Sequence, residues 1–197
     1  MRVDLRIDGG ALVLPGRGIV RAGLAVHGGK IAAIGKEESL PSARRSIDAS
    51  GLHVLPGLVD PHGHMGLSGD FAGECETETR AALKGGVTTI GLFLRSEGDH
   101  LENIPKLAAE VDRNAFIDVF FTLIIGDSKQ TEGIPRYAEE LGVRSFKFYL
   151  WAVPGMKTVD DALLFRAFRE IAALGKDVTA CVHAENPEII NRATALA

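Results

Sequence analysis

The stretch Val54-Leu55-Pro56-Gly57-Leu58-Val59-Asp60-Pro61-His62-Gly63-His64 decides the fold, because an apolar run ends there in polar side chains at alternate positions. On an extended backbone, residues two apart point to the same face of a strand. Asp60, His62 and His64 are therefore expected to project together from one strand end. Two imidazoles so placed can bind one metal ion, and a carboxylate can orient one of them. The alternative is a polar turn whose histidines make ordinary hydrogen bonds.

The composition limits the kind of protein this chain can be. Of its 197 residues 46% are hydrophobic, and 26 acidic against 22 basic residues give a net charge of -4. An acidic balance argues against a nucleic-acid partner, which requires a basic face. Two cysteines form no disulfide framework, so we expect a reducing cytoplasm. No apolar stretch approaches the roughly 20 residues of a membrane span, so we expect no membrane partner.

Residues 1–52 are expected to form short β-strands joined by glycine turns. Asp8-Gly9-Gly10 indicates one turn, and apolar runs on both sides of Gly28-Gly29 predict a hairpin. Because about fifty residues bury little surface, we expect this all-β segment to pack on another part of the protein.

Residues 53–197 alternate apolar strands with segments of helical length, which predicts βα units and a parallel sheet. The expected strands span 53–60, 87–94, 116–125, 143–150 and 177–183, and the expected helices lie near 74–84, 101–111, 133–141, 160–174 and after Pro187. Five strands by count favour a doubly wound open sheet, because a (β/α)8 barrel needs eight strands and about 250 residues.

Polar residues recur at the ends of these strands. Lys147 lies in the fourth strand, and His183 ends the fifth strand, with Glu185 close behind. The carboxyl ends of parallel strands face the ligand in α/β folds, so these groups and the paired histidines are expected to converge.

Lys147 lies between Phe146 and Phe148. It could be a lysine that extends its amine to solvent from a strand end. Alternatively, a lysine desolvated among aromatic groups can lose its proton and become a neutral nucleophile. A neutral amine can add carbon dioxide, and the resulting carbamate can bridge two cations.

Three further residues have structural explanations beside the functional ones. His183 could be a core histidine with a satisfied hydrogen bond. Cys181 is expected to be small core packing, because no other pattern supports thiol chemistry. Arg80 and Glu76, four residues apart on a predicted helix, are expected to form a solvated ion pair.

Four segments together resemble the cyclic amidohydrolases of the amidohydrolase superfamily: hydantoinases, dihydropyrimidinases, allantoinases and dihydroorotases. The segments are Pro56–His64, Gly85-Gly86-Val87-Thr88-Thr89, Ser145-Phe146-Lys147-Phe148-Tyr149 and Val182-His183-Ala184-Glu185-Asn186. The resemblance implies a (β/α)8 TIM-type barrel beside a small β-sandwich. On this reading residues 1–52 belong to the sandwich, residues 53–197 form barrel strands 1–5, and the barrel is truncated after five strands.

The resemblance also implies two divalent metals, usually zinc. His62 and His64 would bind the first ion, His183 the second, and Lys147 would bridge both as a carbamate formed with carbon dioxide. Asp60 and Lys147 are the expected catalytic residues. A further histidine and a proton-delivering aspartate have no position before Ala197, so we expect the chain alone to be inactive or nearly so.

The implied activity is the hydrolytic opening of a small cyclic amide, in a protein that is a homo-oligomer, either a dimer or a tetramer. Dihydroorotases carry an arginine after the paired histidines, whereas Met65, Gly66 and Leu67 follow here, which favours hydantoin or dihydropyrimidine rings. Dihydropyrimidinase-like enzymes place a tyrosine five residues beyond the lysine, where this chain has Ala152, and Tyr149 is out of register. The alternatives are a non-catalytic scaffold relative and a one-metal deaminase.

Overall fold

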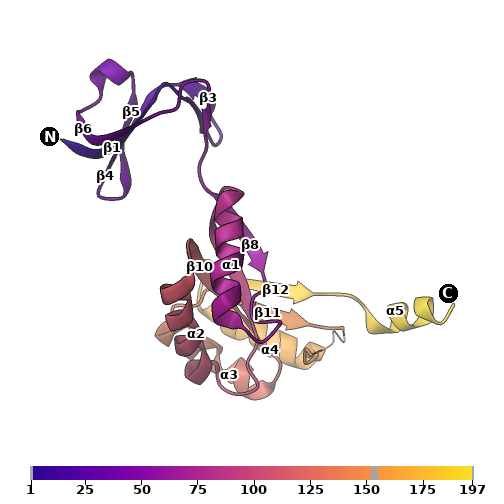
Figure 1. Cartoon of the computed structure of the whole chain (residues 1–197). Coiled ribbons are helices and arrows are strands. Elements are labelled where there is room, and N and C mark those ends of the chain that lie inside the picture. Colours follow the sequence, from indigo (N-terminus) through magenta and orange to yellow (C-terminus); the bar gives the residue numbers. More distant parts are fainter. Residues whose placement is uncertain (1, 152–154, 197) are drawn as a thin grey trace. The chain divides into compact units, whose positions relative to one another are not determined.

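The computed structural model describes residues 2–151 and 155–196. The chain divides into two compact units, residues 1–57 and residues 58–197. Each unit is built on its own sheets (Figure 1). None of the helices in the described residues is long and apolar enough to cross a membrane.

The first unit contains short strands in two small sheets. Its elements are β1 (Val3–Asp8), β2 (Ala11–Leu14), β3 (Gly18–Arg21), β4 (Gly23–His27), β5 (Lys30–Gly35), a 3-10 helix (Glu37–Ser39), β6 (Ala43–Asp48) and β7 (His53–Val54). One sheet has the order β5-β4-β1-β6 and the other has the order β3-β2-β7. The predicted hairpin is confirmed, since β4 and β5 pair antiparallel around Gly28 and Gly29. Both glycines have positive φ, which a two-residue hairpin turn requires.

In its described residues, 58–151 and 155–196, the second unit contains a parallel five-stranded sheet and five helices. Its elements are β8 (Leu58–Gly63), α1 (Phe71–Lys84), β9 (Val87–Leu94), α2 (His100–Asn114), β10 (Asp118–Ile124), α3 (Ser128–Glu140), β11 (Ser145–Tyr149), α4 (Asp161–Ala173), β12 (Thr179–His183) and α5 (Pro187–Thr194). The predicted alternation of strands and helices is therefore confirmed.

The order of this sheet, β12-β11-β10-β9-β8, follows the chain without reversal. Right-handed crossovers that all run in one direction place their helices on the same face of the sheet. The expectation of a doubly wound sheet, drawn from the strand count alone, is therefore wrong, because that fold needs a point at which the strand order reverses. A singly wound parallel sheet is the arrangement of half a barrel.

The main core lies between the sheet and the helices α1–α4. Fully buried side chains of the central strands, such as Leu92, Leu123 and Phe146, share one apolar cluster with helix residues such as Cys75 and Ile134. The edge strand β8 is mostly exposed and β12 is half-buried. The helices therefore pack against one face of the central strands. The site residues lie on the opposite face of these strands.

Aspartates at the carboxyl side of the strands begin the four longer helices. Asp70, Asp99, Asp127 and Asp160 each accept a hydrogen bond from a backbone N–H in the first turn of the following helix. Such caps satisfy backbone donors that the helix leaves free. The cap at Asp127 explains why α3 begins at Ser128, five residues before the predicted start at 133.

One predicted strand is in fact two. The expected strand at 53–60 is divided at Pro56 and Gly57, which lie outside any strand. β7 pairs with β2 in the first unit, whereas β8 pairs with β9 in the second. Proline cannot donate a ladder hydrogen bond, so the run of apolar residues does not continue as one strand.

Candidate metal and active site

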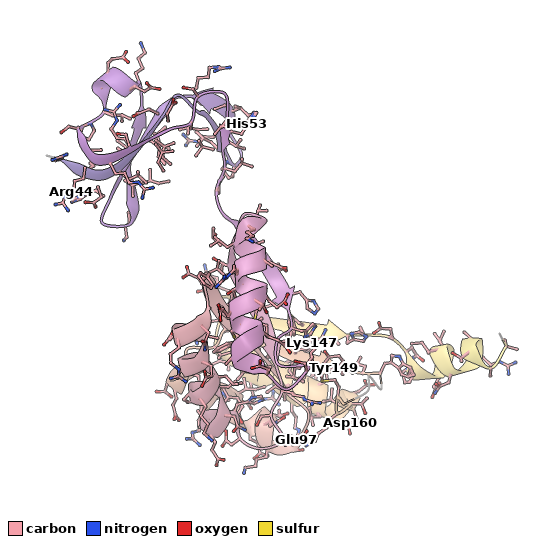
Figure 2. All side chains as sticks on the ribbon, viewed as in Figure 1. Arg44, His53, Glu97, Lys147, Tyr149 and Asp160 are labelled. Carbon is pink, nitrogen blue, oxygen red and sulfur yellow. The ribbon has the colours of Figure 1, made fainter. Side chains whose placement is uncertain are left out.

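The predicted site residues lie at the carboxyl end of the parallel sheet. His62 is in β8, His64 directly follows that strand, Lys147 is in β11 and His183 ends β12. The carboxyl ends of strands in parallel α/β sheets are where ligands bind. Figure 2 labels Lys147 and Tyr149 within this unit.

His62 and His64 form a close pair. Their ring centroids are 5.1 Å apart, and the rings meet edge to face. Both rings contact Phe93 of β9, at centroid distances of 4.2 Å for His62 and 5.8 Å for His64. The phenyl ring therefore forms an apolar wall behind the two imidazoles.

Lys147 also lies near the ring of Phe93. Its Nζ atom lies 5.7 Å from the ring centroid of Phe93 and 5.1 Å from that of Tyr149. The residue is only 6% exposed, so most of its side chain is packed against its neighbours. By strand register, Lys147, Tyr149 and Phe93 lie on one face of the sheet.

Charge and burial act together on His64. Burial lowers the pKa of this imidazole first, and the positive charges of His62 and Lys147 lower it further. The pKa shift therefore favours a neutral imidazole, the form that binds metal ions.

His183 lies one aromatic ring further along the rim. Its ring stacks on Tyr149 with a centroid distance of 5.2 Å and an interplanar angle of 28°. Its Nε2 atom lies 3.0 Å from Oε1 of Glu185. The carboxylate thus engages one ring nitrogen and leaves Nδ1 for another ligand.

Asp60 is not brought to either imidazole. The pairing of β8 with β9 shifts register between Asp60 and Gly63, which breaks the strict alternation assumed for the stretch. The Oδ1 atom of Asp60 instead accepts a hydrogen bond of 3.1 Å from the backbone N–H of His62. Its contact therefore stabilises the backbone at His62, and the structure gives it no contact with an imidazole nitrogen.

The donor set fits a divalent metal centre only in part. Within residues 2–151 and 155–196, no three His, Cys, Asp or Glu side chains are grouped so as to hold a metal ion. The structure instead gathers two histidines and a largely buried lysine whose amine, in the same residues, has no hydrogen bond or ion pair. A carbamate on that amine would supply the anionic oxygens that the group lacks.

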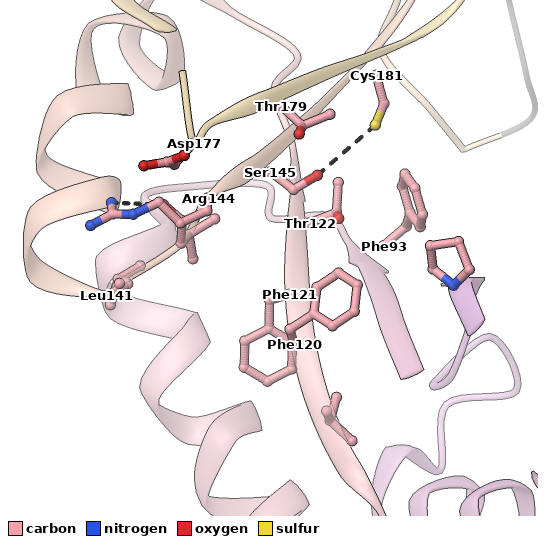
Figure 3. A pocket seen from close by; sticks show the side chains of 14 residues that line it. Phe93, Phe120, Phe121, Thr122, Leu141, Arg144, Ser145, Asp177, Thr179 and Cys181 are labelled. Atoms are coloured by element: carbon pink, nitrogen blue, oxygen red, sulfur yellow. Dashed lines mark hydrogen bonds between the residues drawn. The ribbon is translucent and has the colours of Figure 1, made fainter. Parts of the chain in front are cut away.

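A cavity of about 680 Å³ lies on the same sheet face, toward the amino ends of the strands. Figure 3 shows its walls, among them Phe120, Thr122, Ser145 and Cys181. The Sγ atom of Cys181 is 3.9 Å from Oγ of Ser145, and the thiol packs near Phe93, in keeping with its predicted packing role. His62, His64, Lys147 and His183 do not line this cavity, but Phe93, whose ring lies against the first three, forms part of its wall.

The sequence reading missed the aromatic wall of the site. Phe93 contacts His62, His64 and Lys147, yet a phenylalanine in an apolar strand carries no sequence signal beyond burial. Phe93 lies near the end of β9, level with the ends of β8 and β11. That position is the signal that could have indicated its place in the site. The predicted Arg80–Glu76 pair is confirmed as an exposed ion pair at 2.6 Å.

Comparison with known proteins identifies relatives named hydantoinase and allantoinase. The chain is 36% identical over 185 residues to the D-hydantoinase of Geobacillus stearothermophilus, covering 89% of this chain and 38% of that protein. It is also 36% identical over 206 residues to an allantoinase of Escherichia coli, covering 94% of this chain and 42% of the relative. The chain is a homologue of the cyclic amidohydrolases.

Solved structures of cyclic amidohydrolases have the same fold as this chain over the part that they share. An L-hydantoinase from Arthrobacter aurescens superposes with a TM-score of 0.81 at 32% identity, over 98% of this chain and 43% of that one. A dihydropyrimidinase from Brevibacillus agri gives a TM-score of 0.83 at 28% identity, over 98% and 42% of the two chains. These neighbours imply a partial (β/α)8 barrel with an amino-terminal β unit.

This cyclic amidohydrolase homologue spans about two-fifths of the length of the curated relatives it matches. No protein-family model matches the chain.

Proposed function

We propose that this chain provides the metal-binding part of a hydrolase that opens cyclic amide rings of the hydantoin or dihydropyrimidine type. The observation that carries the proposal is the largely buried Lys147, whose amine lies near the ring of Phe93, as does the close pair His62 and His64. A lysine in that position has no structural purpose that an apolar residue would not serve better. The homologues named hydantoinase and allantoinase support the same chemistry.

The proposed ligands follow from this placement. His62 and His64 hold one divalent ion, His183 holds a second, and Lys147 bridges them as the carbamate of carbon dioxide, with zinc as the proposed metal. When bound, such ions polarise an amide carbonyl and lower the pKa of water. The similarity to these relatives supports the binding of divalent metals in general. The choice of zinc and the carbamate on Lys147 are our own proposal.

The remaining side chains of the site orient and shield these groups. The rings of Phe93 and Tyr149 line the amine of Lys147, whose Nζ atom lies 5.7 Å and 5.1 Å from their centroids. Glu185 orients the ring of His183 through Nε2. Asp60, proposed from the sequence as catalytic, fixes the backbone of His62.

The substrate assignment depends on two sequence positions. Met65 is buried after the paired histidines, and no arginine is present there to bind a substrate carboxylate. This favours an uncharged ring over dihydroorotate. Ala152, the position where a dihydropyrimidinase-like tyrosine is expected, lies outside the described residues.

The test is metal and mass analysis of the purified chain after incubation with zinc and bicarbonate. We expect bound zinc and a mass gain of one carbon dioxide on Lys147. His62→Ala and His64→Ala should each lose the zinc, whereas His27→Ala, a histidine of the first unit, should retain it as the matched control. A chain that binds no zinc would favour the scaffold alternative, and zinc without the carbamate would favour the one-metal deaminase.

We further propose that the protein is a cytoplasmic homo-oligomer, with residues 1–52 in a β-sandwich and residues 53–197 in the barrel. Activity is proposed for a protein that also supplies the additional histidine and the proton-delivering aspartate. Hydantoin hydrolysis by the 197-residue chain alone, abolished by His62→Ala, would contradict this part of the proposal.

A further inference from the structure

One fully buried histidine, His100, is not used by the proposed chemistry. His100 is the first residue of α2 and is 0% exposed. Its ring meets Tyr137 of α3 edge to face, at a centroid distance of 5.2 Å and an interplanar angle of 82°. Among the described residues, its Nδ1 is the buried side-chain nitrogen or oxygen that lacks a hydrogen-bond partner.

The other ring nitrogen of His100 has a single, directed contact. Nε2 lies 3.0 Å from the carbonyl oxygen of Ile124, the last residue of β10. A carbonyl only accepts hydrogen bonds, so Nε2 carries the proton and donates. Burial lowers the pKa of His100, which keeps the imidazole in this neutral form.

The peptide group between Ile124 and Ile125 accepts the hydrogen bond from His100 and donates a second hydrogen bond to Lys147. The carbonyl of Ile124 and the N–H of Ile125 belong to one planar peptide unit. That N–H donates to the backbone carbonyl of Lys147 at 2.9 Å. Ile124 is also the residue of β10 that pairs with Lys147 in the strand register. A continuous series of hydrogen bonds therefore runs from the His100 imidazole through one peptide unit to the backbone of Lys147.

Hydrogen bonds in such a series polarise and strengthen one another, and a fixed peptide plane transmits orientation. An apolar side chain would fill the space of His100 as well, without leaving Nδ1 unpartnered. The donor at Nε2 is what an apolar residue could not replace.

We propose that His100 is a positioning residue that fixes the end of β10 and, through the 124–125 peptide, the backbone of Lys147. Its effect on metal binding rests on the function proposed above for Lys147. His100 itself contacts neither metal nor substrate.

The experiment compares two substitutions at His100 with a control in α1 that contacts the backbone at the opposite end of β10. His100→Gln keeps a donor near the position of Nε2, and His100→Leu keeps apolar volume without a donor. Thr79→Val is the control, because Thr79 is fully buried and its Oγ1 accepts a 3.0 Å bond from the N–H of Phe116, just before the opposite end of β10. Hydrogen exchange of the Ile125 amide and zinc affinity in the presence of bicarbonate are measured on the full chain.

In His100→Leu, we expect exchange of the Ile125 amide to accelerate by about tenfold, the effect of losing one net hydrogen bond. We expect zinc affinity to fall by about tenfold, as for other groups that orient metal ligands. His100→Gln should have the exchange rate and the zinc affinity of the unsubstituted chain. Thr79→Val should change neither of these, even if it lowers global stability as much as His100→Leu does.

Two results overturn the proposal. One is unchanged exchange at Ile125 in His100→Leu, and the other is accelerated exchange with unaltered zinc affinity. If the wild-type chain binds no zinc, the proposed function fails, while the exchange rates of Ile125 still decide whether His100 fixes this backbone.

Discussion

At the scale of single residues, the chain keeps an amine where packing alone would select a hydrocarbon. Lys147 is 6% exposed and contacts the rings of Phe93 and Tyr149, with no carboxylate partner in the described residues. A buried cation without a partner destabilises the folded state. Such a residue is retained for its chemistry, and stability and function should therefore respond in opposite directions when it is replaced.

We predict that Lys147→Met leaves the free energy of unfolding unchanged or raises it by about 1 kcal/mol, because methionine fills the site without a charge. Zinc binding should be lost. Urea denaturation and zinc titration measure the two effects. Lys84→Met, at an exposed position in the last turn of α1, is the control and should alter neither. A clear loss of stability in Lys147→Met would show that the amine has a stabilising partner.

His100 predicts how stability depends on pH. Burial lowers its pKa in the folded state, and the hydrogen bond to Ile124 and the charges of Asp99 and Asp127 oppose that shift only in part. The unfolded chain therefore binds a proton at this histidine before the folded chain does. Stability from this group is complete above pH of about 6.5 and falls as pH drops, by up to about 1.4 kcal/mol per pH unit.

Urea denaturation at pH values between 7 and 5 measures this slope. His100→Gln, which cannot titrate, should show a shallower loss of stability over that range. His64, whose pKa is also lowered, contributes equally to both proteins, so the difference isolates His100. Identical slopes in the two proteins would contradict the prediction.

At the scale of elements, helix starts determine where the loops of the candidate site begin. The carboxylate of Asp160 accepts a 2.7 Å hydrogen bond from the N–H of Leu163 and so caps α4. α4 follows the loop that leaves β11, the strand of Lys147. The cap therefore fixes one end of a loop beside the proposed ligands.

We predict that Asp160→Ala lowers the free energy of unfolding by about 1 kcal/mol, the usual effect of removing a cap. Asp160→Asn should retain most of the stability, because its amide oxygen also accepts. Asp161→Ala is the matched control, since Asp161 is in the first turn without capping it and should cost only a few tenths of a kcal/mol. Equal losses at both positions would mean that charge, and not the cap, stabilises α4.

At the scale of the whole molecule, the five-stranded sheet has two edge strands, β8 and β12. Edge strands present unpaired backbone groups that can pair with another chain. Leu58 and Val59 of β8 are 54% and 61% exposed, so this edge is also apolar. Both features favour association between copies of the chain.

We therefore predict self-association that increases with concentration in sedimentation velocity. Val59→Lys should reduce it, because a charge on an edge strand disfavours pairing with a second strand. Leu83→Lys, a matched change at an exposed apolar position of helix α1, which has no sheet edge, should leave it unaltered. A wild-type chain that stays monomeric at all concentrations would contradict the prediction.

The sequence alone determined the alternation of strands and helices, the parallel sheet, the Gly28-Gly29 hairpin and the amidohydrolase resemblance. These follow from local patterns, namely the apolar period, turn glycines and residue types at strand ends. The sequence also indicated His62, His64, Lys147 and His183, whose role as metal ligands stays a prediction.

Tertiary structure alone decided the matters that depend on register and on contacts between distant segments. The register shift in β8 separated Asp60 from the imidazoles, and the sequential strand order excluded the doubly wound sheet. Phe93 lies near three candidate ligands, and hydrogen bonds connect His100 to the backbone of Lys147. Both sets of contacts involve residues from different strands and helices. No local pattern encodes such contacts, because they arise only when β9, β10 and β11 lie side by side.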